Sequence, residues 1–384
     1  MKSIKKYGYG KQSITFSDIW EVIKALKSPC LTQGSKIKEF EDAICSYTGA
    51  KYAVVASNGT AALHLCMLVL DIKDGDEVIT SPNTFLASSN CVLYAGGVPK
   101  FADIESETAN ISTEEIEKQI TPNTKGIIPV HFAGQSCDME KIKKIADKHN
   151  LFVVEDAAHA IGSEYKGTKV GSCKYSDMTI FSFHPVKTIT TGEGGAITTN
   201  NKELYEKLLI FRSHGVTKNP KILTKNDGFW YYEMHELGYN YRITDIQAAL
   251  GISQIKRLDK FAKKRRQIVE WYKQAFADDE KFSLLEEKEY SKACFHLCPL
   301  LIDFDKISIS KKELFNKLIE NGLNLQVHYI PVHTQPYYKK LGFKEGDFPN
   351  AEEYYKKTIS LPLYVDFNYS DVKHIVKIIK EMAK

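Results

Sequence analysis

Two residues stand where they could do chemistry together, Lys187 and Asp156. Lys187 follows an apolar, strand-like run at residues 178–183 and precedes a glycine-rich turn at residues 190–195. Asp156 stands two positions after a second apolar run, residues 151–154, at the tip of the expected strand. The carboxyl ends of the strands in an α/β sheet meet along one edge, where such proteins bind ligands. The sequence therefore predicts an amine and a carboxylate at one site.

A third segment, residues 54–63, has the pattern of a short strand, a small polar turn and a helix. Gly59 and Thr60 would open that helix, and the free N–H groups and positive dipole end of a helix N-terminus attract phosphate. Ser182, from the run before Lys187, could add a hydroxyl donor. These residues predict a phosphate site beside the amine.

An amine that forms an imine, an anion that keeps a ring nitrogen protonated and a phosphate site are the requirements of pyridoxal 5′-phosphate. Each feature alone has a more ordinary explanation. Most lysines are solvated, and Asp156, Ser57 or Asn58 could simply cap a turn or helix. Only the combination favours the cofactor.

The composition excludes several classes of protein. The 384 residues carry 52 basic and 48 acidic side chains and a net charge of +4, so no nucleic-acid partner is expected, and the basic run at residues 263–266 is interpreted as a solvated face. No membrane contact is expected either, because no apolar run approaches spanning length. The chain starts without an apolar leader, and its eight cysteines are scattered, which predicts a cytoplasmic protein with reduced thiols.

One cluster has the composition of a metal site. Cys294, His296 and Cys298 stand at alternate positions, as residues of a strand do, and no second ligand pair accompanies them. We therefore expect no metal.

The elements that must position these residues alternate along the chain. Seven strands are predicted between residues 52 and 199, with helical patterns between them, which is typical of a mostly parallel sheet covered by helices. They are residues 52–56, 77–80, 98–103, 126–132, 152–156, 178–183 and 196–199.

The pattern then changes to long charged helices, with further strands expected at residues 296–304 and 325–329 and an exposed loop at residues 217–227. We expect an α/β protein with a large cofactor-binding domain, residues 1–252, and a smaller α/β domain, residues 253–384.

Taken in order, the motifs of the chain resemble those of the DegT/DnrJ/EryC1/StrS family of sugar aminotransferases over nearly its whole length. The matching segments are residues 57–63, 84–85, 155–159, 181–187, 193–195, 212–215 and 238–249. The resemblance implies a fold-type I, aspartate-aminotransferase-like enzyme that uses pyridoxal phosphate, and a homodimer with active sites shared between its subunits.

The resemblance also implies roles for individual residues. Lys187 would bind the cofactor as an imine and later act as the base, and Asp156 would pair with the pyridine nitrogen. Further cofactor contacts fall on Phe85 at the ring face, on Gly59, Thr60 and Ser182 at the phosphate, on Asn240 from the partner subunit, and on His159 near the 3′-oxygen, where glutamine is common in the family. Arg242 and His328 are candidates for substrate carboxylate or phosphate contacts, with surface or helix-capping groups as the open alternative.

Residues 184–187 and 326–329 resemble most closely the family branch that aminates C4 in pseudaminic acid biosynthesis. The function so implied is transfer of the amino group of glutamate to C4 of a UDP-linked 4-keto-6-deoxy-HexNAc. The alternatives are a different nucleotide-linked keto sugar, dTDP-linked or 3-keto, and a noncatalytic regulator. A dehydratase of the same family would carry histidine at position 187, and a dinucleotide-binding dehydrogenase would carry G-x-G-x-x-G after the first strand.

Overall fold

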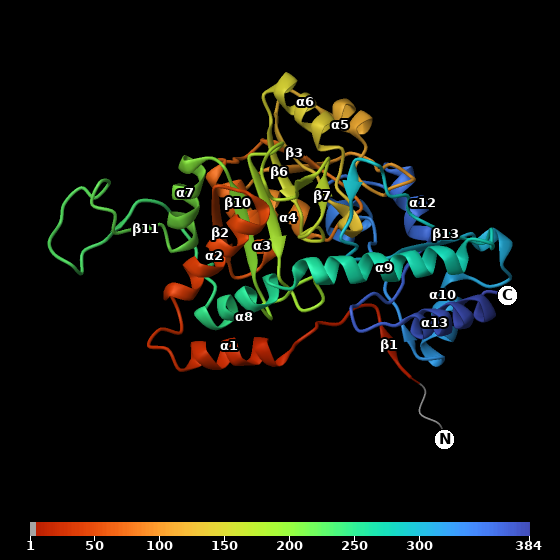
Figure 1. Ribbon diagram of the computed structural model, residues 1–384. Coiled ribbons are helices and arrows are strands. Elements are labelled where there is room, and N and C mark those ends of the chain that lie inside the picture. The colour runs from red at the N-terminus through yellow and green to blue at the C-terminus, as the bar shows by residue number, and fades with distance from the viewer. Residues whose placement is uncertain (1–4) are drawn as a thin grey trace.

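The computed structural model describes residues 5–384, and its centre is a seven-stranded sheet (Figure 1). The strand order is β2-β10-β9-β6-β5-β3-β4, and β10 alone runs antiparallel to both of its neighbours. The strands are β2 (Tyr52–Ala56), β3 (Glu77–Thr80), β4 (Val98–Phe101), β5 (Thr124–Ile128), β6 (Phe152–Asp156), β9 (Met178–Ser182) and β10 (Gly195–Thr199).

The prediction of a mostly parallel α/β sheet is confirmed, and each of the seven predicted strands has a counterpart. The ends differ most for β5, which stops at Ile128 instead of residue 132. Pro129 follows and has no N–H to donate to a neighbouring strand, so the regular ladder ends there.

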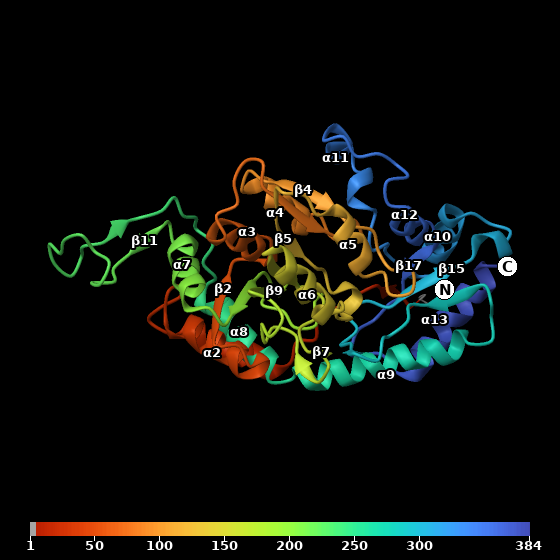
Figure 2. The same ribbon diagram turned by 90° about the horizontal axis from the view of Figure 1, so that it is seen from above.

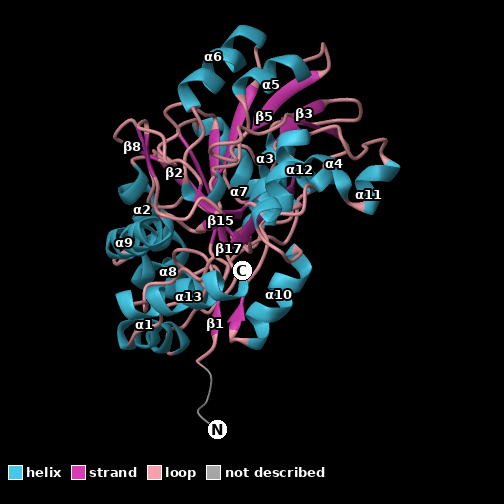
Figure 3. Ribbon diagram, turned by 90° about the vertical axis from the view of Figure 1, so that its right-hand side faces the viewer, coloured by secondary structure: helices cyan, strands magenta, loops and turns pink. Residues whose placement is uncertain are grey.

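Helices cover both faces of this sheet because successive side chains of each strand point to opposite sides. In β9, Ile180 packs into the cluster on one face while Phe181 packs into the cluster on the other. The first face is covered by α3 (Gly59–Val69), α4 (Ala87–Tyr94) and α7 (Lys202–Arg212). The second is covered by α2 (Ser35–Thr48), α5 (Thr113–Gln119), α6 (Met139–His149) and α8 (Asp245–Ile255), and Figure 3 shows the strands lying between helices.

The C-terminal part has a separate apolar core, built on an antiparallel sheet of β13 (Phe282–Leu284), β15 (Pro299–Ile302) and β17 (Thr358–Ser360). Its helices are α9 (Leu258–Phe276), α10 (Lys311–Glu320) and α13 (Tyr369–Met382). Helix α9 connects the two parts, since Leu258 and Phe261 belong to a core cluster of the large sheet and Ile268 to the C-terminal core. A smaller C-terminal unit is therefore present, and its boundary at residue 252 stays a prediction.

Two strand predictions in this part were wrong in extent. The strand expected at residues 296–304 is limited to Pro299–Ile302. Phe295, directly before the expected start, has a left-handed backbone (φ 51°), and a 3₁₀ turn begins at Phe304. Residues 325–329 form no strand and contribute one isolated bridge, between Gln326 and Ser360.

The N-terminal segment crosses the molecule. β1 (Tyr7–Gly8) pairs in parallel with β16 (Leu323–Asn324), and α1 (Phe16–Leu26) packs on α8. On the opposite side, β11 (Val216–Thr217) and β12 (Glu233–Met234) form the base of an arm that extends away from the body (Figure 2). The loop expected at residues 217–227 lies in this arm.

The remaining elements are β7 (Glu164–Tyr165), β8 (Thr168–Lys169), β14 (Ser291–Lys292), α11 (Pro336–Lys340), α12 (Pro349–Lys357) and 3₁₀ turns at Phe132–Gly134, Phe304–Lys306 and Val332–Thr334.

Among residues 5–384, no helix combines the length and the apolar character needed to cross a membrane. All eight cysteines are free thiols. The described part of the chain contains no group of three or more His, Cys, Asp or Glu residues arranged to hold a metal ion.

Candidate active site

A cavity of about 650 Å³ opens where the carboxyl ends of β2, β9 and β6 meet. The three strands end at the same edge because β10 alone is reversed between β2 and β9. Asp156 is the last residue of β6 and Ser182 the last of β9, while the turn after β2 leads directly into α3. The fold thus brings the three predicted segments to one cavity.

The N-terminus of α3 forms one end of this cavity. Asn58 is its N-cap, and the Asn58 side chain accepts a hydrogen bond from the Ala61 amide at 2.8 Å. Within residues 5–384 the amides of Gly59 and Thr60 make no hydrogen bond, as is usual for the first turn of a helix. A Cβ at position 59 would lie 3.0 Å from Ser182 Cβ. Glycine therefore allows a close approach of α3 to β9 and leaves two donors free for an anion.

Asp156 is 5% exposed, and both oxygens of its carboxylate accept hydrogen bonds. Oδ1 accepts a hydrogen bond from the Ala158 amide at 3.0 Å, and Oδ2 accepts one from the Ser88 hydroxyl at 2.6 Å. Ser88 is itself 2.7 Å from the Thr84 hydroxyl, which completes a chain of donors. Hydrogen bonds to a carboxylate stabilise its charge, so the cavity contains a fixed anion.

Lys187 lies in the turn after β9 and lines the same cavity. Burial lowers the pKa of its amine to about 8, and the opposing effect of the Asp156 charge is smaller. More of this amine is therefore uncharged near neutral pH than of a solvated lysine, and a nucleophile or a base must be uncharged.

Histidine and tyrosine side chains form the opposite wall. His159 Nε2 lies 3.0 Å from the Tyr329 hydroxyl, and burial holds the pKa of His159 well below its usual value, with a further contribution from Lys187. His328 Nδ1 lies 2.7 Å from the Ser360 hydroxyl, and burial followed by the Lys187 charge lowers the pKa of His328 to about 4. The peptide bond between His328 and Tyr329 is cis. These imidazoles are uncharged at neutral pH.

Eight of the ten predicted site residues line the cavity, namely Gly59, Thr60, Phe85, Asp156, His159, Ser182, Lys187 and His328. The Phe85 side chain is 59% exposed, which leaves its ring free to cover a ligand. Asn240 and Arg242 are not among the lining residues: Asn240 is exposed and bridges to Ser213. Within one chain, Asn240 and Arg242 therefore lie apart from the eight predicted residues that line the cavity.

Several lining residues were missed by sequence reasoning. Tyr329 lines the cavity and is next to the predicted His328. Ser88 does not line the cavity, but it bonds to Asp156 and was also missed. Tyr9 reaches the cavity from the N-terminal segment, and no nearby sequence motif predicts its position there. His296 was interpreted as an ordinary strand residue, whereas it is 5% exposed and lines the cavity.

The chain matches the model of the DegT/DnrJ/EryC1/StrS aminotransferase family over residues 12–380. It is 43% identical to the UDP-4-amino-4,6-dideoxy-N-acetyl-beta-L-altrosamine transaminase of Campylobacter jejuni, covering 96% of this chain and 95% of that one. Among solved structures, Helicobacter pylori PseC, an aminotransferase involved in the biosynthesis of pseudoaminic acid, has a TM-score of 0.90 and 35% identity and covers 99% of both chains. The putative sugar aminotransferase Spr1654 of Streptococcus pneumoniae, solved in PLP and PMP forms, has a TM-score of 0.91 and 32% identity over 98% of both chains.

Proposed function

The chain belongs to the DegT/DnrJ/EryC1/StrS aminotransferase family, and from that premise we propose that it transfers the amino group of glutamate to C4 of a UDP-linked 4-keto-6-deoxy-HexNAc, using pyridoxal phosphate. The predictions of family and of an aminotransferase are confirmed by the matches above. The observation that carries the proposal is the position of Lys187, an amine of lowered pKa in one cavity with Asp156 and the open N-terminus of α3.

The donor set fits pyridoxal phosphate. The free amides of Gly59 and Thr60 and the Ser182 hydroxyl form a phosphate site, and the Gly59–Ser182 approach leaves no room for a larger residue. Asp156 supplies an anion for the pyridine nitrogen, and Phe85 an aromatic face for the ring. The predicted cofactor agrees with the PLP and PMP forms in which Spr1654 has been solved. When bound, the cofactor supplies an electron sink for the negative charge that develops on the reacting carbon.

Lys187 has two tasks in this scheme. Its uncharged amine would hold the cofactor, and its Nζ would take the proton from the α-carbon of glutamate. With the keto sugar, the same Nζ returns a proton to C4. A pKa near 8 suits both directions of transfer, because the amine is neither fully charged nor a strong base at neutral pH.

Asp156 and His159 keep the cofactor in its reactive state. The two hydrogen bonds to Asp156 stabilise its charge, which would pair with the ring nitrogen of the cofactor. His159 is oriented by the Tyr329 hydroxyl and is assigned to the cofactor's 3′-oxygen. Its low pKa means that it approaches that oxygen as a neutral imidazole.

Asn240 and Arg242 are assigned to the active site of a second copy of this chain. Neither lines the cavity of its own chain, and the nearby arm is rich in exposed apolar side chains, including Phe229 at 92% and Leu237 at 75%. Exposed apolar groups on this scale mark contact surfaces. A homodimer would bury the arm and let Asn240 reach the partner's phosphate site, with Arg242 beside the substrate.

One experiment tests the function. The purified protein is incubated with glutamate and a panel of UDP-, dTDP- and GDP-linked 4-keto and 3-keto sugars, and products are identified by mass spectrometry and NMR. The proposal expects a 4-amino product from the UDP-linked 4-keto-6-deoxy-HexNAc. Amination of only dTDP-linked or 3-keto sugars would overturn the substrate and keep the aminotransferase. No amination of any sugar would leave the noncatalytic alternative.

A further inference from the structure

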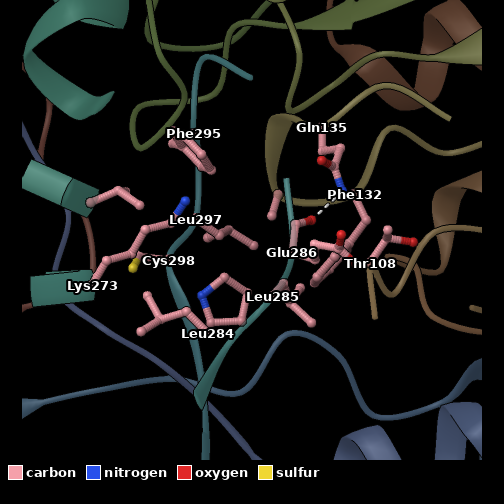
Figure 4. A pocket seen from close by; sticks show the side chains of 13 residues that line it. Thr108, Phe132, Gln135, Lys273, Leu284, Leu285, Glu286, Phe295, Leu297 and Cys298 are labelled. Carbon is pink, nitrogen blue, oxygen red and sulfur yellow. Dashed lines mark hydrogen bonds between the residues drawn. The ribbon is translucent and has the colours of Figure 1, made fainter. Parts of the chain in front are cut away.

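His296 lies in the segment between β14 and β15, on the opposite side from its neighbours. Phe295 and Leu297 line a separate small cavity of about 20 Å³, together with Phe132 and Thr108 (Figure 4). His296 instead lines the active-site cavity, where its ring centroid is 4.6 Å from that of His159. A neutral imidazole in a cavity that holds substrates has a donor and an acceptor to offer.

The backbone around His296 is held by a buried cation. Arg265 of α9 is 2% exposed and donates from Nη1 to the carbonyl oxygens of Phe295, His296 and Leu363 at 3.4, 3.3 and 3.2 Å. No carboxylate pairs with Arg265 among the described residues. Burying an unpaired charge is costly, so a positive potential is maintained behind the His296 wall at the expense of stability.

We propose that His296, together with His328, binds the carboxylate that is attached to the reacting carbon of the amino donor. The inference rests on the function proposed above and names two residues that hold the donor in that site. Nδ1 of His296 is sealed from solvent without a partner, whereas Nε2 is not sealed and forms no hydrogen bond within the described chain. His328 is anchored through Nδ1 by Ser360, which leaves its Nε2 for a ligand.

The carboxylate of the amino donor needs a binding group close to Lys187. In glutamate, this carboxylate is bonded directly to the carbon whose proton Lys187 removes, so it lies about 1.5 Å from that carbon. Among the described residues of one chain that line its cavity, none is arginine and the one lysine is Lys187 itself, so the partner's Arg242, proposed above, is the only arginine assigned to this site. His296 and His328 are both close enough to Lys187 for its charge to lower their pKa values. The keto sugar has no charge next to its reacting carbon.

Neutral imidazoles also explain how one wall serves two unlike substrates. Burial, followed by the charges of Lys187, His159, Arg265 and His328, holds the pKa of His296 well below its usual value. A carboxylate placed against the ring opposes these effects and favours protonation. The ring then carries a positive charge and binds the carboxylate. When a sugar occupies the site, the ring is neutral again and can form hydrogen bonds with the sugar hydroxyl groups. An arginine at this position would stay charged with both the amino donor and the keto sugar.

Proton uptake on donor binding is the measurable consequence. The holoenzyme is titrated with 2-oxoglutarate, which carries the same carboxylate, in two buffers of different ionisation enthalpy at pH 7.5. Calorimetry of the wild type is expected to show net proton uptake. His296→Gln keeps a hydrogen-bond donor but cannot be protonated, so we expect roughly 10-fold weaker binding, within the range of one hydrogen bond to a charged group, and less proton uptake.

Matched measurements separate this role from a structural one. His333→Gln changes another buried histidine, which bonds to Glu352 and does not line the cavity, and should bind 2-oxoglutarate as the wild type does. UDP affinity should be unchanged in His296→Gln, and KM should rise for glutamate but not for the nucleotide sugar. Equal 2-oxoglutarate affinity and proton uptake in His296→Gln and the wild type, absence of binding to the wild type, or a rise in KM confined to the sugar would each overturn the proposal. Failure of the proposed function is recognised separately, as glutamate-dependent conversion of the cofactor without amination of any sugar.

Discussion

The Ser88 hydroxyl donates a 2.6 Å hydrogen bond to Oδ2 of Asp156, so a residue from the start of α4 holds the anion at the end of β6. A hydrogen bond to a charged group contributes about 1.5–3 kcal/mol. We expect Ser88→Ala to lower the rate of glutamate conversion by roughly 10-fold or more, because Asp156 loses one of its two donors. Ser89→Ala is the control, since Ser89 bonds to Tyr338 away from the cavity. Equal rates for the two variants would show that Ser88 has no part in holding Asp156.

Asp156→Asn removes the charge itself and should have a larger effect. The variant should retain the cofactor, because the phosphate site and Lys187 are intact, and should lose several orders of magnitude in rate. Asp156→Glu should be less affected because it keeps the charge. Cofactor content by absorbance and single-turnover rates with glutamate distinguish the two effects. Wild-type rates in Asp156→Asn would make this carboxylate a structural group.

Lys187→Ala should abolish transamination and the yellow colour of a lysine-bound cofactor while circular dichroism stays that of the wild type. The substitution removes an amine at a cavity wall and leaves the packed cores untouched. More than trace turnover in this variant contradicts the assignment.

The lowered pKa of Lys187 also affects the stability of the cofactor-free protein. The folded-state pKa is about 8, against 10.5 when the side chain is solvated. The unfolded chain therefore binds more protons between these pH values, and folding becomes more favourable as pH rises through this range. Below pH 8 burial of the charged amine costs about 3 kcal/mol, from 1.36 kcal/mol per pKa unit.

Lys187→Met should consequently stabilise the cofactor-free protein at pH 7, and the advantage should shrink by pH 10. Denaturant unfolding of both proteins at the two pH values measures the difference. A stability difference that is the same at both pH values would show that the amine titrates normally.

Subunit mixing tests the shared site. Lys187→Ala and Asn240→Ala each inactivate a different half of the composite site, so heterodimers of the two should contain one intact site. Activity should appear after unfolding and refolding the variants together and stay absent when each is refolded alone. A fully active monomer by light scattering would exclude the shared arrangement.

The sequence predicts the sheet well where strands are short, continuous and apolar. β2, β3 and β6 have the predicted ends; β2 and β3 are bounded by polar residues on both sides, and β6 itself ends in the polar pair Glu155 and Asp156. Sequence reasoning failed at His296, where alternation resembled a strand although a left-handed Phe295 changes the direction of the chain. No local pattern reveals that Tyr9 enters the cavity, since its position depends on contacts across the whole chain. Asn240 and Arg242 show the remaining limit: neither lines the cavity of its own chain, and their roles in a second copy stay a proposal.

The pairing of β1 with β16 has a consequence for how the protein is made. Tyr7 is 2% exposed, contacts the C-terminal core and donates a hydrogen bond to Asp371 of α13. During synthesis on the ribosome, this segment emerges hundreds of residues before its strand partner at Leu323. The large sheet has all its strands by residue 199 and can form while translation continues. The C-terminal unit cannot be completed before Leu323 and Asp371 are translated, so nascent chains that stop before these residues should expose the Tyr7 segment to chaperones and proteases.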